Sequence, residues 1–124
     1  MSRFHALLLA ALFSAVIASA AQAEGDAAHG KALFSSRCAI CHAPTAQNKV
    51  GPGLSGVFGR SAGTAPNFQY SKAMASYAKH WDDQTLDSFL TAPAKALPGT
   101  KMTIAVPCAS DRSDIIAYLK TIGP

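Results

Sequence analysis

Charged residues are scarce in this sequence, and the basic ones do not cluster. The 124 residues include 11 Lys and Arg against seven Asp and Glu, and charged side chains make up 15% of the chain. A dense Lys/Arg run of the kind that binds nucleic acid is lacking, so composition does not favour a nucleic-acid-binding protein. Internal repeats and low-complexity tracts are lacking too. The length is therefore that of one small domain.

A hydrophobic run long enough to cross a bilayer is also lacking. The longest apolar stretch covers residues 6–20, which is shorter than the ~20 residues that span a membrane comfortably. It follows Arg3 and precedes Ala21-Gln22-Ala23, a small-x-small pattern that signal peptidase recognises. We expect residues 1–23 to be a cleaved signal peptide and residues 24–124 to be the mature domain. An uncleaved membrane anchor is the alternative.

Export would place the protein in the periplasm and change its charge slightly. Loss of Arg3 would leave ten basic against seven acidic residues, a formal net charge of +3. This weak excess favours approach to an acidic protein surface. Ala18-Ser19-Ala20 is a second cleavage signal in the same segment.

Cysteine is rare, with three residues, and two of them form the most informative motif of the chain. Cys38-Ala39-Ile40-Cys41-His42 has the C-x-x-C-H spacing at which a c-type haem is attached. Two thiols at this spacing can add to the two vinyl groups of a porphyrin, and the adjacent imidazole can bind the iron. A redox dithiol would be expected in a βαβ unit, which is not visible here. A zinc site would need further ligands, and Cys108, His29 and His80 are scattered.

The periodicity of apolar residues predicts several helices and no regular strand pattern. We expect a first helix over residues 24–37 with Asp26 at its start, and a last helix from residue 110 or 111 to 121. Shorter helices are expected over residues 71–79 and from residue 82 or 83 to 91, where Pro93 follows. Gly30 is unfavourable in mid-helix unless something packs closely there. We expect the last helix to cross it, with Tyr118 or Leu119 over the missing side chain.

Residues in the loops complete the candidate cofactor site. The carbonyl of Pro52 can accept the second ring N–H of His42. Arg60 can pair with a buried haem propionate, or can be an ordinary surface arginine. The single tryptophan, Trp81, can donate to a propionate or simply fill the core.

The sixth iron ligand is expected to be a methionine. Met102 follows the turn signature Pro98-Gly99, so it is presented from a loop. Met74 is the rival, but it lies inside a predicted helix. A methionine that merely fills the core is the other interpretation of Met102.

Taken together, these motifs resemble those of the small soluble class I cytochromes c, the group that holds mitochondrial cytochrome c and bacterial cytochrome c2. The resemblance covers nearly all of residues 24–124. The matching segments are Gly25-Asp26 with Gly30 and Phe34, the C-x-x-C-H at 38–42, Gly51-Pro52-x-Leu54, Gly56-x-Phe58-Gly59-Arg60, Ala65-Pro66-x-Phe68-x-Tyr70, Trp81, Leu97-Pro98-Gly99-Thr100-Lys101-Met102 and Ile116-Ala117-Tyr118-Leu119.

The resemblance implies an all-α, single-domain cytochrome c fold whose helices wrap around one haem and whose N- and C-terminal helices cross. It implies thioether attachment through Cys38 and Cys41, and axial ligation of the iron by His42 and Met102. It further implies that the carbonyl of Pro52 binds the ring of His42. The residues implied around the propionates are Arg60, Tyr70, Trp81 and Thr100.

The implied function is one-electron transfer between redox proteins by a monomeric carrier, not an enzyme, without nucleic acid and without a membrane span after processing. Partners would dock at the exposed haem edge. The basic residues near this edge are Arg37, Lys49, Lys95 and Lys101.

Two alternatives to a free carrier stay open. One is a haem with an accessible sixth position that binds a diatomic gas or turns over peroxide. The other is a dedicated subunit of one dehydrogenase or oxidase, held by an apolar patch around Ile104 and Val106.

Four positions depart from the family pattern or are left unassigned. Phe89 and Met74 stand where mitochondrial cytochromes carry a Tyr and an Asn near the Met sulfur, and Ile104 stands where they carry a Phe beside the haem edge. The strength of the Met102–iron bond therefore does not follow from the resemblance. Cys108 is either a small buried hydrophobic residue or a thiol that pairs between molecules.

Overall fold

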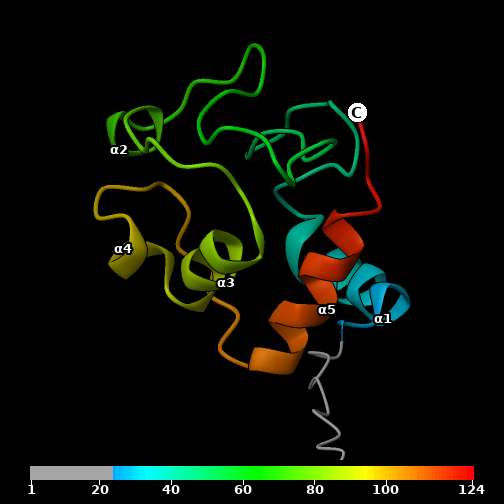
Figure 1. Ribbon diagram of the computed structural model, residues 1–124. Coiled ribbons are helices and arrows are strands. Elements are labelled where there is room, and N and C mark those ends of the chain that lie inside the picture. The colour runs from blue at the N-terminus through cyan, green and yellow to red at the C-terminus, as the bar shows by residue number, and fades with distance from the viewer. Residues whose placement is uncertain (1–23) are drawn as a thin grey trace, which may run out of the picture.

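The computed structural model describes residues 24–124 as a bundle of short helices joined by long loops (Figure 1). Within these residues, the strand-like pairing is limited to one antiparallel bridge between Ser61 and His80. None of the helices described is long and apolar enough to cross a membrane. The predicted signal peptide lies outside the described residues. The helical segments are α1 (Ala27–Leu33), η1 (Phe34–Cys38), α2 (Lys72–Ala75), α3 (Asp83–Thr91), α4 (Pro93–Ala96) and α5 (Ala109–Leu119).

The first predicted helix is interrupted before it reaches the cysteines. Asp26 caps α1 as expected, because its carboxylate accepts the backbone N–H groups of Ala28 and His29 at 2.9 and 3.1 Å. After Leu33 the helix widens into the π-helical segment η1. Such widened turns are rare in proteins, and those that occur are often found at functional sites. A regular helix over residues 24–37 was therefore the wrong prediction for its last turn.

α1 and α5 cross where Gly30 leaves room, as the sequence predicts. Gly30 is buried, and a Cβ atom built on it would overlap the backbone carbonyl of Asp114. The residues over Gly30 are therefore the backbone of Asp114 and Ile115, and the expectation of a Tyr118 or Leu119 side chain there was wrong. One turn further on, Phe34 packs edge-on against Tyr118 with ring centroids 5.3 Å apart.

The middle helices are shorter than expected or were not predicted. α2 ends at Ala75 instead of residue 79, because the following residues turn back and the N–H of Ala62 binds the carbonyl of Lys79 at 2.8 Å. α3 begins after its N-cap Asp82, which forms a reciprocal capping box with Thr85, and ends at Thr91, as predicted. Pro93 does not only end α3. It also opens the unpredicted α4, at the first-turn position where proline needs no N–H partner.

A single hydrophobic core joins η1, α3 and α5. Its buried members include Phe34, Trp81, Phe89, Val106 and Ile115, of which Ile115 is 1% exposed. Cys38, Met74 and Met102 are partly buried and pack against this cluster. In Figure 1, α1 and α5 lie on one side of the molecule, α2 and α4 lie on the opposite side, and α3 lies between them.

Candidate haem site

Segment η1 and the turn after it present the C-x-x-C-H motif. The N–H of Ala39 donates to the carbonyl of Phe34 at 2.9 Å, and those of Cys41 and His42 donate to the carbonyl of Cys38 at 3.1 and 2.9 Å. Both thiols are free and partly buried. Burial raises the pKa of Cys38. The backbone thus holds two thiols and an imidazole in one tight turn.

The ring of His42 is fixed by the loop that follows it. Its Nδ1 lies 2.8 Å from the carbonyl oxygen of Pro52. A carbonyl can only accept, so Nδ1 carries the proton and the lone pair of a neutral ring remains on Nε2. Burial lowers the pKa of His42, which favours this neutral form. Gly51 lies against the ring so closely that a Cβ there would overlap it.

The Ser61–His80 bridge brings two of the predicted propionate residues together. The N–H of Trp81 donates to the carbonyl of Arg60 at 2.9 Å, and the N–H of Gly59 donates to the carbonyl of Trp81 at 2.6 Å. Trp81 is 6% exposed, so it is a buried residue whose backbone is paired with that of Arg60.

Arg60 provides the test of whether an acidic group fits here. Its Nη1 and Nη2 donate to the carbonyls of Ser55 and Gly53 at 3.2 and 3.3 Å. Its Nε, in contrast, is buried without a hydrogen-bond partner among the described residues. A buried guanidinium N–H without an acceptor is costly. A propionate is the type of group that would satisfy it, so the residues present fit a haem.

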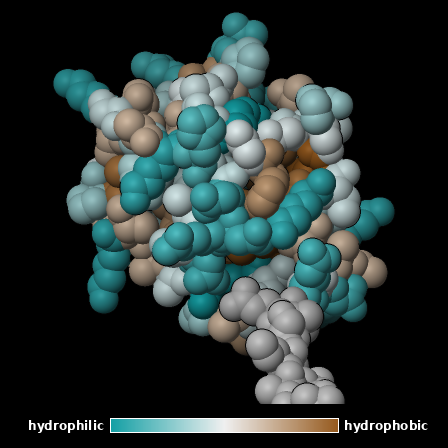
Figure 2. Space-filling model, viewed as in Figure 1, coloured by the Kyte–Doolittle hydropathy of each residue, from teal (hydrophilic) through white to brown (hydrophobic). Residues whose placement is uncertain are grey.

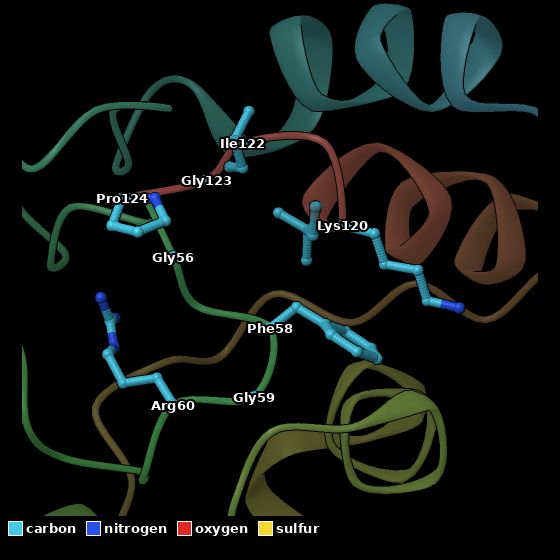
Figure 3. A pocket seen from close by; sticks show the side chains of 9 residues that line it. Gly56, Phe58, Gly59, Arg60, Lys120, Ile122, Gly123 and Pro124 are labelled. Carbon is cyan, nitrogen blue, oxygen red and sulfur yellow. The ribbon is translucent and has the colours of Figure 1, made fainter.

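A recess of about 390 Å³ lies beside Arg60, between residues 56–60 and the end of the chain. Figure 3 shows the side chain of Arg60 on one wall, with Ile122 and Pro124 on the opposite side. Phe58 lines the recess next to Lys120, whose Nζ lies 5.0 Å from the ring centroid.

Tyr70 and Thr100 lie on loops and make local bonds in the structure. The hydroxyl oxygen of Tyr70 accepts the N–H of Ala65 at 3.0 Å, which leaves its own O–H available as a donor. The hydroxyl oxygen of Thr100 accepts the N–H of Met102 at 3.4 Å. Thr100 therefore helps to shape the turn that presents Met102.

Met102 lies in a loop and Met74 lies inside α2, which agrees with the presentation expected from the sequence. Both are partly buried. Phe89 is buried, with its ring 5.2 Å from that of Trp81. Ile104, in contrast, is 55% exposed. The departures from the family pattern thus include two apolar residues that point into the core and one at the surface.

The four basic residues expected at the docking edge differ in how free they are. Arg37 lies 3.4 Å from a carboxylate oxygen of Asp111. Lys49 and Lys101 donate to backbone carbonyls. Lys95 is exposed on α4. Much of the expected positive charge is therefore engaged within the molecule.

Exposed apolar side chains occur where the sequence analysis did not point to them. Ile40 and Val50 are 74% and 79% exposed. Val106 is 2% exposed, so the prediction of an exposed apolar patch formed by Ile104 and Val106 was wrong. Figure 2 shows that hydrophilic residues cover most of one face and that hydrophobic surface is recessed among them.

Two polar residues that hold the site together were missed. Asn48 donates to the carbonyl of Pro66 at 2.9 Å and accepts the N–H of Gly53 at 3.0 Å, which ties the loop after His42 to a distant loop. An Asn in a Gly- and Pro-rich stretch was the available signal. The second residue is Arg112, which lies on the apolar face of α5 and is 8% exposed. Its spacing from Ile115 and Ile116 was the signal for burial.

These features define an all-α protein built around a covalently bound prosthetic group. A tight turn offers two thiols and an imidazole whose ring is fixed by a hydrogen bond, and Arg60 has a buried Nε–H that an acidic group would satisfy. The comparisons with known proteins give the particular family.

A family model described as Cytochrome c matches residues 27–123. The chain is 48% identical over 100 residues to a cytochrome c of Euglena viridis, covering 79% of this chain and 98% of the relative. It is 42% identical over 120 residues to a cytochrome c2 of Rhodomicrobium vannielii, covering 94% of this chain and 95% of the relative. Among solved structures, cytochrome cH from Methylobacterium extorquens matches with a TM-score of 0.74 and 41% identity, covering 78% of this chain and 99% of that one.

The chain belongs to the cytochrome c family. This confirms the predicted family, the small all-α fold and the covalently attached haem c with its iron. The protein is accordingly a haem-based electron carrier.

Proposed function

We propose that the protein is a soluble periplasmic carrier of single electrons, in which His42 and Met102 bind the haem iron and Cys38 and Cys41 attach the porphyrin. The hydrogen bond between His42 Nδ1 and the Pro52 carbonyl is the observation that carries this proposal, because it leaves the lone pair of Nε2 free to bind the iron. The bound iron supplies a one-electron couple between its ferric and ferrous forms. Residues 1–23 would direct export and be removed.

The chain contributes to this function by keeping both ligands in place. His42 is held by Pro52 and by the backbone of Gly51. Met102 is held by the turn at Thr100. Such fixed ligands leave little to rearrange when one electron is gained or lost, and they leave no open position for a substrate. This supports a carrier rather than an enzyme.

The surroundings of the haem are assigned from the same geometry. Arg60 would satisfy its buried Nε with a propionate, and Trp81 is paired to it through the backbone. Tyr70 retains a free O–H, and Thr100 lies two residues before Met102. Redox partners would dock near Arg37, Lys49, Lys95 and Lys101. The protein would act as a monomer.

An optical spectrum of the purified holoprotein tests the proposal. A sulfur-to-iron charge-transfer band in the ferric form and no response of the ferrous form to carbon monoxide are expected, because Met102 occupies the sixth position. A ferric form without this band, together with ready binding of carbon monoxide, would show an open iron. The protein would then be a ligand-binding or peroxide-consuming haem protein.

A further inference from the structure

Arg112 is the one charged residue buried among residues 24–124. It lies on α5 in the apolar face that also holds Ile115 and Ile116. Burying a guanidinium is costly unless its N–H groups are paired. Its position therefore calls for an explanation in terms of what it binds.

The guanidinium joins three segments of the chain. Its Nε donates to a carboxylate oxygen of Asp87 on α3 at 2.7 Å. Its Nη1 donates to the carbonyls of Val106 and Pro107 at 3.0 and 2.8 Å. Hydrogen bonds from a charged donor are stronger than neutral ones, and the rigid fork of arginine fixes their directions. Asp87 thus orients the guanidinium of Arg112, which also donates hydrogen bonds to the loop between α4 and α5; Figure 1 shows the course of this loop.

This loop is the segment that carries Met102, and it is anchored at its ends. Upstream, Leu97 is buried and its N–H donates to the carbonyl of Pro93 at 2.9 Å. Downstream, Val106 is 2% exposed and its N–H donates to the carbonyl of Leu90 at 2.7 Å.

Between Met102 and the downstream anchor the chain is weakly held. Residues 103–105 are exposed, and within residues 24–124 their N–H groups have no hydrogen-bond partner. Few buried contacts and solvent-exposed backbone are the features of a segment that opens locally. The position of Met102 therefore depends on the anchors at both ends of the loop.

We propose that Arg112 is a positioning residue for Met102: its hydrogen bonds to the carbonyls of Val106 and Pro107 keep the Met102 loop closed over the sixth coordination position of the iron. The inference rests on the proposed axial role of Met102. It concerns the equilibrium between a closed loop and an open loop from which Met102 has moved away.

Imidazole added to the ferric holoprotein measures this equilibrium. It can bind the iron only when Met102 has left, so its apparent affinity is the intrinsic affinity multiplied by the fraction of open molecules. Loss of a hydrogen bond from a charged donor changes such an equilibrium by about tenfold or more. Arg112→Gln is therefore expected to tighten the apparent binding of imidazole by about tenfold, followed as loss of the sulfur-to-iron band.

Two further variants separate this role from general support of the helices. Lys120→Gln removes the 2.8 Å ion pair between Lys120 and Asp83, which also joins α5 to α3 but does not touch the loop. It is expected to leave imidazole binding within about twofold of wild type. Asp87→Asn keeps both carbonyl bonds of Arg112 and weakens only its orientation. It is expected to fold and to give an intermediate increase, so it decides the question if Arg112→Gln does not fold.

Chemical unfolding of each variant completes the test. If the Arg112 and Asp87 variants unfold more easily but bind imidazole as wild type does, then Arg112 only supports the packing of the helices and the inference is wrong. If the Lys120 variant tightens imidazole binding as much, the effect is not specific to the loop and the inference fails as well. If wild type itself lacks the sulfur-to-iron band, the proposed ligation by Met102 is wrong, and this is known before any variant is compared.

Discussion

The crossing of α1 and α5 predicts that Gly30→Ala destabilises the protein. A Cβ at this position would overlap the carbonyl oxygen and carbon of Asp114. These are backbone atoms of α5, so no change of rotamer can make room. The two helices would have to move apart.

The magnitude follows from three opposing contributions. In an exposed helix, Gly→Ala would stabilise by about 1 kcal/mol through helix propensity. Overpacking at a close contact costs about 1–3 kcal/mol, and separation of the helices also loosens the edge-on pair of Phe34 and Tyr118, worth about 0.5–1.5 kcal/mol. The net expectation is a loss of about 0.5–3.5 kcal/mol, opposite in sign to the effect of propensity alone.

Equilibrium unfolding of the ferric holoprotein in guanidinium chloride, followed by circular dichroism, measures this loss. The midpoint should fall at unchanged slope. Ala32→Gly, at an exposed position of the same helix, is the matched control and should cost only about 1 kcal/mol. A Gly30→Ala protein that is as stable as wild type, or more stable, would refute the close backbone contact.

Three further predictions concern other residues. His29 and Asp114 lie 2.6 Å apart, and their hydrogen bond raises the pKa of His29 and lowers that of Asp114. The pair therefore stabilises the fold fully between about pH 3.9 and 6.5, and this contribution is lost as pH rises through the pKa of His29 or falls through that of Asp114. A stability difference between wild type and His29→Gln that stays constant from pH 5.5 to 9 would contradict it. Met102→Ala should abolish the sulfur-to-iron band and admit carbon monoxide, whereas Met74→Leu should do neither; the reverse result would make Met74 the ligand. Cys108 is exposed, and hydrogen bonds from the Ser110 side chain and nearby backbone N–H groups lower its pKa, so a thiol reagent should label it in the native protein, and a native protein that resists labelling would show that the thiol is covered.

The parts of the structure that the sequence predicts are those in which one residue type has one physical use. Asp26 caps a helix because its short carboxylate reaches two free N–H groups. Gly30 predicts a helix crossing because a glycine is unfavourable in mid-helix unless another segment packs closely against it. The C-x-x-C-H motif predicts a haem because two thiols and an imidazole at this spacing suit its covalent attachment. In each case the local chemistry excludes most alternatives.

The parts that the sequence does not predict depend on distant partners. Pro93 is compatible with the end of one helix and with the start of the next, and only the turn at Ala92 decides. α2 ends early because residues after it pair with the chain near Ala62. The spacing of Arg112 from its apolar neighbours places it on the apolar face of α5, but its acceptors come from Asp87 on α3 and from loop carbonyls, and the sequence does not predict these contacts.

The two sides of the molecule therefore differ in how they are stabilised. The side with His42 is fixed by the α1–α5 crossing, where the backbones of two helices meet. The side with Met102 is built from α2 and α4, which have four residues each. Helices this short are not stable without tertiary contacts. Local opening should therefore begin on the Met102 side, at a lower free energy than global unfolding. Under the proposed ligation, opening on this side would release Met102 from the iron before the rest of the protein unfolds.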